Sequence, residues 1–292
     1  MSDLVPDVPT LRAGLESAGY LAGDALATAL LLAVRMRQPI LLEGEPGVGK
    51  TEAARALAST LDSRLIRLQC YEGLSSTEAL YEWNYPRQLL AIRLAEARGE
   101  TLRDADLFNE DYLLERPLLA AISHPGPLPA VLLIDEVDRA DDEFEAFLLE
   151  LLADAAVTIP ELGTRRATVP PIVVLTSNRT RDLHDALKRR CLYHWIAYPG
   201  TDRVAAIIRR RVPSAAGWLA DRVAFAVQRL RSQPLTKPPG LAEAINWANA
   251  LHVLGVSTMD ETAIGSTLGA VLKYPEDSDA VRQSGLAALA DA

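Results

Sequence analysis

The chain has 292 residues, of which 49% are hydrophobic and 24% are charged. These fractions are close to those of ordinary globular proteins, so they exclude collagen-like, coiled-coil and wholly disordered chains. The 30 Lys and Arg residues are outnumbered by 39 Asp and Glu residues, which gives a net charge of -9. Because excess negative charge repels polyanions, we expect no nucleic-acid partner.

The cysteine content and the apolar stretches indicate in which cellular compartment the protein is found. Cys70 and Cys191 are the two cysteines, too few for a disulfide scaffold, and they favour a reducing compartment. The longest apolar stretch, residues 25–34, is far shorter than the ~20 residues that cross a bilayer. The first ten residues are acidic and contain proline, unlike a secretory signal. We therefore expect a cytoplasmic protein with no membrane span.

In chain order, the first clear pattern is a strand, a glycine-rich turn and a helix. Residues 24–37 are densely apolar and end in basic residues, as in a buried helix. The apolar run 40–42 predicts a short strand that ends at Gly44. Residues 50–61 then place Ala and Leu at helical spacing.

The next segments predict a second strand and an interrupted helix. Residues 64–70 alternate between apolar and polar side chains, which is typical of a strand. Residues 75–98 are mostly helical in pattern but contain a proline. We expect an insertion into this helix near residues 81–86.

Two continuous aliphatic runs complete the β pattern. Residues 131–134 and 172–176 are typical of strands buried on both faces of a parallel sheet. Between them, residues 142–155 predict an amphipathic helix and residues 157–169 predict a hairpin. The recurring order of strand and helix predicts a three-layer α/β domain with a parallel sheet.

Strand signals end near residue 200. The remainder is rich in Ala and Leu at helical spacing and is broken by a turn at residues 234–240. We expect an α/β domain over residues 1–200 and a small all-helical domain over residues 201–292.

Residues 44–51 match the phosphate-loop motif G-x-x-x-x-G-K-[ST]. Glycines let successive backbone N–H groups face phosphate oxygens, and the following helix adds its positive N-terminal end. Lys50 supplies a charge for the β and γ phosphates, and the hydroxyl of Thr51 is a ligand for Mg²⁺. The candidate nucleotide-binding residues are Gly44, Glu45, Pro46, Gly47, Val48, Gly49, Lys50 and Thr51.

Asp135 and Glu136 follow the aliphatic run 131–134. Ligands of open parallel sheets bind at the carboxyl ends of the strands. We expect Asp135 to share Mg²⁺ with Thr51, and Glu136 to activate water. Because positioning and charge neutralisation supply most of phosphoryl transfer, these residues predict a nucleoside triphosphatase. The chain has no Asn-Lys-x-Asp segment for recognising guanine, which favours ATP.

Together these motifs resemble those of AAA+ ATPases, with Walker A at 44–51, Walker B at 131–136, Asn178 after the next buried strand, and an arginine pair at 189–190. More narrowly, the chain resembles the MoxR branch, including its CoxD-type accessory ATPases of carbon monoxide dehydrogenase maturation. The segments that carry this likeness are LLEGEPGVGKTEAARALA, VLLIDEVDRADDEFEAFLLELLAD, VTIPELGT, VVLTSN and DLHDALKRRCLYHWI. The resemblance implies a P-loop NTPase (AAA+) core followed by a helical lid domain.

The resemblance also implies roles for single residues. Asn178 is similar to sensor 1, whose amide orients the attacking water, and a plain turn former after a strand is the alternative interpretation. Arg190 is similar to the arginine finger that reaches a neighbouring subunit's γ phosphate, and Arg189 is the alternative. A basic helix end that interacts with its own dipole is a competing interpretation of this pair. An arginine acting in trans requires a homo-oligomeric ring, which the family implies is a hexamer, and Arg139 is a further candidate for its subunit junction.

The helical domain departs from the family pattern. Where most AAA+ proteins carry a sensor 2 arginine, this chain has the stretch KPPGLAE beginning at Lys237. Lys237 either replaces that arginine in contacting nucleotide or is a solvated loop lysine.

Four aromatic residues gather within fifteen positions: Tyr71, Tyr81, Trp83 and Tyr85. They lie in segments that resemble pore-facing loops, where aromatic rings grip a polypeptide without recognising its sequence. A local packing cluster is the alternative interpretation.

The function implied by the resemblance is an ATP-driven chaperone that remodels a client protein. The implied client is a metalloenzyme, molybdenum carbon monoxide dehydrogenase during completion of its metal site, with a von Willebrand factor A-type protein as adaptor. Two alternatives stay open. One is a DNA-remodelling motor, which the net charge disfavours, and the other is a nucleotide-dependent binding switch without turnover.

Overall fold

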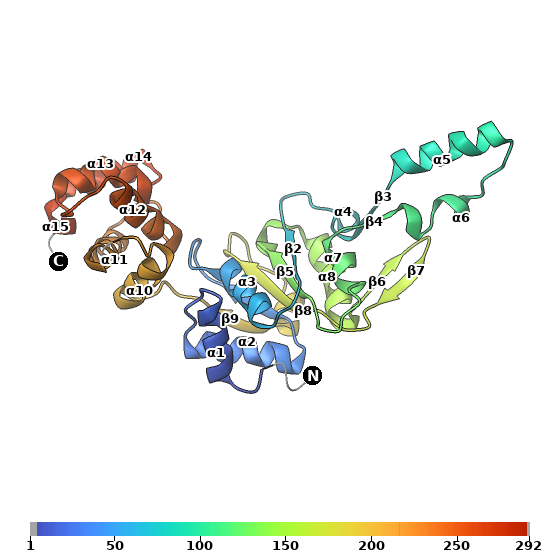
Figure 1. Cartoon of the computed structure of the whole chain (residues 1–292), viewed down its shortest axis with the longest axis horizontal. Coiled ribbons are helices and arrows are strands. Elements are labelled where there is room, and N and C mark those ends of the chain that lie inside the picture. Colours follow the sequence, from blue (N-terminus) through green and yellow to red (C-terminus); the bar gives the residue numbers. More distant parts are fainter. Residues whose placement is uncertain (1–4, 216, 291–292) are drawn as a thin grey trace. The chain divides into compact units, whose positions relative to one another are not determined.

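The computed structural model describes residues 5–215 and 217–290. The chain divides into two compact units (Figure 1), which we take separately. The first unit comprises Met1–Glu43 and Lys50–Trp195, and the second comprises Gly44–Gly49 and Ile196–Ala292. The glycine-rich loop is thus grouped with the helices at the end of the chain.

A five-stranded parallel sheet forms the centre of the first unit, in the order β2-β5-β8-β1-β9. Its strands are β1 (Ile40–Glu43), β2 (Leu65–Gln69), β5 (Val131–Asp135), β8 (Ile172–Ser177) and β9 (Leu192–Trp195). Gln69 pairs with Asp135, and Glu43 pairs with Ser177. This register brings the carboxyl ends of neighbouring strands to one edge of the sheet.

Helices cover both faces of this sheet. Leu132 and Ile134 belong to a buried cluster with residues of α4 (Ser76–Leu80), α7 (Pro117–Ile122), α8 (Asp142–Asp154) and α9 (Asp185–Arg190). The alternate residues of β5 point to the opposite face, because side chains alternate along a strand. There α3 (Lys50–Thr60) contacts β5 and β8, and α1 (Val8–Ser17) contacts both α3 and α2 (Asp24–Met36). The predicted three-layer α/β core is confirmed.

The segment after β2 differs from the expected interrupted helix. The chain forms α4, then β3 (Tyr81–Trp83), then α5 (Tyr85–Arg98). Pro86 lies in the first turn of α5, so it begins this helix instead of interrupting one. The strand β3 pairs antiparallel with β4 (Leu113–Glu115), and α6 (Asp104–Leu107) and η1 (Glu110–Tyr112) lie between α5 and β4. In Figure 1, α5 extends from this strand pair away from the sheet.

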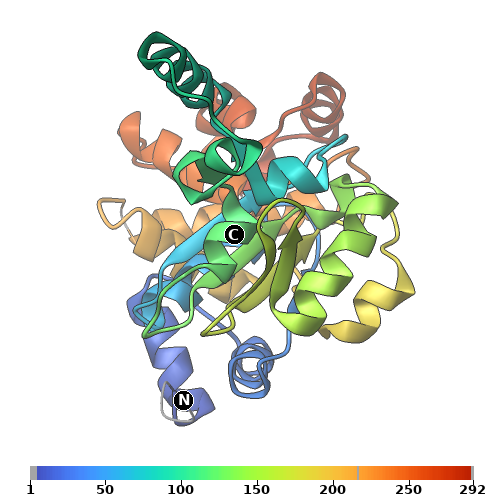
Figure 2. The same cartoon turned by 90° about the vertical axis from the view of Figure 1, so that its right-hand side faces the viewer.

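A two-stranded antiparallel ribbon follows α8, where the sequence predicted a hairpin. It consists of β6 (Ala156–Ile159) and β7 (Gly163–Arg166), and β6 contacts α8. Figure 2 shows the ribbon, in yellow-green, beside this helix. The 3-10 turn η2 (Val137–Arg139) connects β5 to α8.

The second unit is helical after residue 200. Its helices are α10 (Thr201–Arg211), α11 (Gly217–Arg231), α12 (Leu241–Val253), α13 (Glu261–Val271), α14 (Pro275–Ser284) and α15 (Ala287–Ala290). Trp247 is fully buried among them and donates from Nε1 to Thr267 Oγ1 at 2.8 Å. Across residues 5–215 and 217–290, none of the helices is both long and apolar enough to cross a membrane.

We expect Thr267→Val to lower the free energy of unfolding of the helical unit by about 1–3 kcal/mol. The variant keeps the shape of the side chain but leaves the indole N–H of Trp247 buried without its acceptor. Guanidinium unfolding followed by circular dichroism measures the change, with Thr267→Ser as the control that keeps the hydroxyl. Equal stability of the Val and Ser variants would contradict this account of the core.

Candidate functional site

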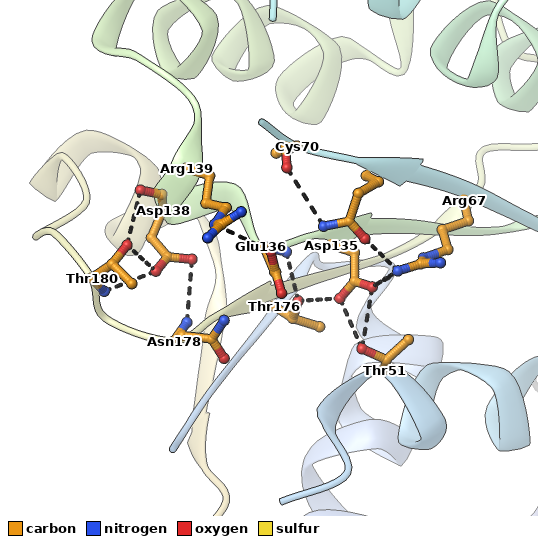
Figure 3. A network of polar contacts seen from close by, with 11 residues as sticks. Thr51, Arg67, Cys70, Asp135, Glu136, Asp138, Arg139, Thr176, Asn178 and Thr180 are labelled. Carbon is orange, nitrogen blue, oxygen red and sulfur yellow. Dashed lines mark hydrogen bonds and ion pairs between the residues drawn. The ribbon is translucent and has the colours of Figure 1, made fainter. Parts of the chain in front are cut away.

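The carboxylate of Asp135, the last residue of β5, lies at the centre of a buried polar network (Figure 3). Only 2% of this residue is exposed. Its Oδ1 accepts from Thr176 Oγ1 at 2.6 Å and from Thr51 Oγ1 at 2.9 Å. Its Oδ2 accepts from Arg67 through Nε at 3.0 Å and Nη2 at 2.6 Å. These donors offset the cost of burying a carboxylate and connect β5 to β8, α3 and β2.

Thr51 and Asp135 fit a magnesium ion chemically. Mg²⁺ takes oxygen ligands and is usually bound by one or two carboxylates together with substrate phosphates, not by a cage made of protein alone. Within the described part of the chain, no three His, Cys, Asp or Glu side chains gather as a metal site. A hydroxyl and a carboxylate within hydrogen-bond distance are therefore suited to a metal that arrives with a phosphate ligand.

The glycine loop precedes Thr51 directly in the chain. Gly47 has a φ of 77°, and its carbonyl accepts from the backbone N–H of Leu241 at 3.0 Å. A Cβ atom on Gly47 would lie 3.3 Å from the Cα atom of Gly240, and one on Gly44 would lie 2.3 Å from the carbonyl oxygen of Ile196. Both positions therefore require glycine. Lys50, the first residue of α3, is only 6% exposed, which is uncommon for lysine.

Within the second unit, the glycine loop borders a cavity of about 180 Å³. The residues around it include Glu45, Pro46, Gly47, Tyr198, Lys237 and Glu243. The segment that carries Lys237 is held by the buried carboxylate of Asp277, which accepts from the backbone N–H groups of Thr236 at 2.7 Å and Lys237 at 3.1 Å. Lys237 thus lines the same cavity as the glycine loop.

Arg231 contacts two of the residues that line this cavity, Tyr198 and Pro239. Its guanidinium carbon lies 4.1 Å from the ring centroid of Tyr198, and its Nε donates to the carbonyl of Pro239 at 2.7 Å. Burial lowers the pKa of Arg231 and raises that of Tyr198. A stacked cation and a hydrogen bond therefore fix the positions of Tyr198 and Pro239 around the cavity.

Glu136 occupies an uncommon backbone conformation directly after Asp135. Its φ of 56° and ψ of 50° lie in the left-handed region, which costs energy for a residue with a side chain. Its N–H donates to Thr176 Oγ1 at 2.9 Å, and its carboxylate forms an ion pair with Arg139 Nε at 3.4 Å. The Thr176 hydroxyl therefore orients both acids, because it accepts from one residue and donates to the other.

Asn178 follows the end of β8 and is positioned through its backbone. Asp138, which is 2% exposed, accepts from the N–H of Asn178 at 3.2 Å and from the N–H and hydroxyl of Thr180 at 2.8 and 2.7 Å. Asp138 thus holds the segment that carries the candidate sensor. Sequence reasoning missed Asp138 and Arg67. The only signals were an acid three positions after Asp135 and a charged residue at a polar position of an alternating strand.

Arg189 and Arg190 are the last two residues of α9, and both side chains are exposed. Among the described residues, no hydrogen bond or ion pair joins either side chain to Asp135 or Glu136. The carbonyl of Arg190 accepts from Gln38 Nε2 at 3.3 Å, which anchors the helix end. An exposed pair is compatible with action on a neighbouring subunit and with a simple interaction with the helix dipole, so both interpretations stand.

The four aromatic residues do not act as one group. Tyr81 and Trp83 point inward from β3, and their ring centroids lie 5.9 Å apart. Trp83 also packs edge-on against Phe108 at 5.2 Å. Tyr71 and Tyr85 are 48% and 61% exposed. The expectation of client-gripping rings is therefore wrong for Tyr81 and Trp83, because strand alternation turns both of them into the core.

The order of the sheet, with the loop between β1 and α3 and with acids at the end of β5, defines the AAA+ P-loop NTPase fold. Residues 39–191, just over half of the chain, match the AAA domain (dynein-related subfamily). The chain belongs to this family.

The chain is 26% identical over 154 residues to the uncharacterized protein YeaC of Bacillus subtilis (strain 168). This match covers 52% of the chain but only 39% of YeaC. Two solved structures of Thermotoga maritima RuvB variants resemble the fold with a TM-score of 0.50. They are 17% and 18% identical, with 85% of this chain and 69% of each RuvB chain covered. At that identity the likeness shows the fold alone.

We expect Asp138→Asn to increase amide hydrogen exchange at residues 178–180 by about tenfold or more, because an amide cannot replace all three charge-assisted hydrogen bonds. Exchange measured by mass spectrometry tests this, with exposed Glu143→Gln as the control. Unchanged protection in Asp138→Asn would show that the carboxylate does not hold the segment.

We expect both thiols to resist alkylation in the folded protein. Burial and the nearby carboxylates of Asp135, Asp138 and Glu136 raise the pKa of Cys70 to about 12, and burial raises that of Cys191 to about 12. At pH 8 the thiolate fraction is about one in ten thousand. Iodoacetamide labelling should therefore be slow before unfolding and complete after it, whereas rapid labelling of the native chain would contradict these pKa values.

Proposed function

We propose that the chain is an ATP-hydrolysing chaperone that remodels a client protein. The observation that carries the ATPase part is the contact between Thr51, which ends a complete phosphate-loop motif, and the buried carboxylate of Asp135 at 2.9 Å. Family membership supports it, because the chain has the AAA domain over residues 39–191.

Each residue of the proposed mechanism has one task. Backbone N–H groups of residues 47–51 and the ammonium of Lys50 bind the phosphates. Thr51 and Asp135 would hold Mg²⁺, which supplies charge neutralisation on the phosphate oxygens. Glu136 accepts the proton of the attacking water, and Asn178 orients that water.

Lysine and arginine side chains have the remaining roles in the proposed mechanism. In the proposal, Lys237 contacts nucleotide from the helical unit. Arg190, or its neighbour Arg189, neutralises charge in the site of an adjacent subunit, which requires a homo-oligomeric ring, a hexamer. The exposure of both arginines supports this part.

The proposed client is a molybdenum metalloenzyme such as carbon monoxide dehydrogenase, engaged through a von Willebrand factor A-type adaptor in the cytoplasm. The support is the resemblance of the long motif segments to the MoxR branch and its CoxD-type members. Two buried free thiols are compatible with a reducing compartment. The net charge of -9 favours a protein client over DNA.

We expect Glu136→Gln to retain ATP binding but to release phosphate at least about a hundredfold more slowly, because the variant lacks the proton acceptor. Steady-state phosphate release measures the effect, and Glu150→Gln on the exposed face of α8 is the control. Full activity in Glu136→Gln would exclude the residue as the base.

The same variant tests the chaperone part of the proposal. With ATP present, a ring blocked in hydrolysis should co-purify with a protein client. Recovery of nucleic acid in place of protein, with salt-dependent DNA binding in an anisotropy assay, would favour the DNA-remodelling motor.

A further inference from the structure

Arg67 makes contacts that the proposed function does not use. It lies in β2, and its guanidinium pairs with Asp135 Oδ2 through Nε at 3.0 Å and Nη2 at 2.6 Å (Figure 3). The side chain of Asp135 is 3% exposed, whereas that of Arg67 is 40% exposed. The acid is therefore fixed inside the protein, and the cation can reach water without unfolding its surroundings.

The carboxylate of Asp135 is saturated with donors. A carboxylate has about four acceptor positions in total. The Thr176 hydroxyl donates to Oδ1, the two guanidinium nitrogens donate to Oδ2, and the Thr51 hydroxyl lies 2.9 Å from Oδ1 and 3.2 Å from Oδ2. Thr51 is itself the other candidate magnesium ligand and Thr176 is a neutral donor, so Arg67 is the one cation among these donors, and a metal at Asp135 would compete with it.

The charges of the groups also indicate that Arg67 and Mg²⁺ compete for Asp135. A buried carboxylate needs a cation nearby, and Arg67 provides it. If Mg²⁺ binds the same carboxylate, one negative charge is shared by two cations, and the ion pair with Arg67 weakens. The apparent affinity of Asp135 for Mg²⁺ is therefore lowered by the free energy that is needed to weaken its ion pair with Arg67.

Arg67 is also connected to an exposed loop. Its Nη2 donates to Gln69 Oε1, and Gln69 Nε2 donates to the carbonyl of Cys70 at 3.5 Å. Cys70 is followed by residues 71–73, all exposed, among them Tyr71. These hydrogen bonds connect the candidate metal ligand Asp135, through the side chains of Arg67 and Gln69, to the base of this loop.

We propose that Arg67 is a positioning residue that competes with Mg²⁺ for Asp135 and, through Gln69, transmits the occupancy of that carboxylate to the loop of residues 71–73. The inference rests on the proposed nucleotide site and adds to it a device by which metal loading changes the surface available to a client. In the absence of Mg²⁺, Arg67 contacts both Asp135 and Gln69. When Mg²⁺ binds Asp135, the contact of Arg67 with Gln69 is weakened.

The decisive experiment titrates MgCl₂ into the intact chain with the fluorescent nucleotide mant-ATP, beside a parallel titration in EDTA. We expect Arg67→Gln to lower the Mg²⁺ concentration at half-saturation by about tenfold, because a charge-assisted hydrogen bond no longer has to be broken. Arg64→Gln, an exposed arginine just before β2, is the matched control and should leave the midpoint unchanged. Arg67→Lys keeps the charge and should shift the midpoint in the same direction by less, so it tests the proposal even where the Gln variant does not fold.

An unchanged or raised Mg²⁺ midpoint in Arg67→Gln, with nucleotide binding in EDTA retained, overturns the competition while leaving the proposed function intact. Absence of mant-ATP binding in the wild-type chain overturns the proposed function and the inference together. For the loop, amide exchange of residues 71–73 should respond to Mg²⁺ in the wild type and lose this response in Gln69→Ala. An equal response in both chains would overturn the transmission step.

Discussion

The burial of one carboxylate constrains the organisation of the first unit. Asp135 lies at the end of a fully buried strand, and its charge is tolerated because donors from three other elements reach it. The same contacts bring the end of the phosphate-loop motif, through Thr51, to the strand-end acids. The hydroxyl of Thr176, which donates to Asp135, also accepts from the N–H of Glu136 and so stabilises the left-handed backbone conformation of that residue. One buried charge thus aligns the candidate metal ligands and the candidate base.

The second unit constrains the glycine loop. Leu241 N–H donates to the Gly47 carbonyl, and the close approach of Gly240 leaves no room for a side chain at Gly47. Asp277 holds the segment of Lys237 that borders the same cavity. The loop conformation therefore depends on contacts with residues almost two hundred positions later in the chain.

Much of the fold could be predicted from the sequence, because the buried strands are continuous aliphatic runs and the loop is a motif with a known mechanism. The edge strand β9 could not, since LYHW alternates between half-buried and exposed side chains and lacks an apolar run. The strand pair β3–β4 was missed because three-residue strands carry too short a pattern. At the site, Asp135 and Thr51 were recognisable from their motifs. The partnership of Arg67 with Asp135 was not, because it depends on two strands pairing across the sheet.

We propose above all that Mg-ATP binds where Lys50 and Thr51 begin α3, beside Asp135. Isothermal titration calorimetry of the intact chain with ATP in the presence of Mg²⁺ tests it directly, with Lys50→Ala as the matched variant. We predict saturable binding by the wild-type chain and loss of that binding in Lys50→Ala. Absence of binding heat in the folded wild-type chain, or equal affinity in both chains, would contradict it.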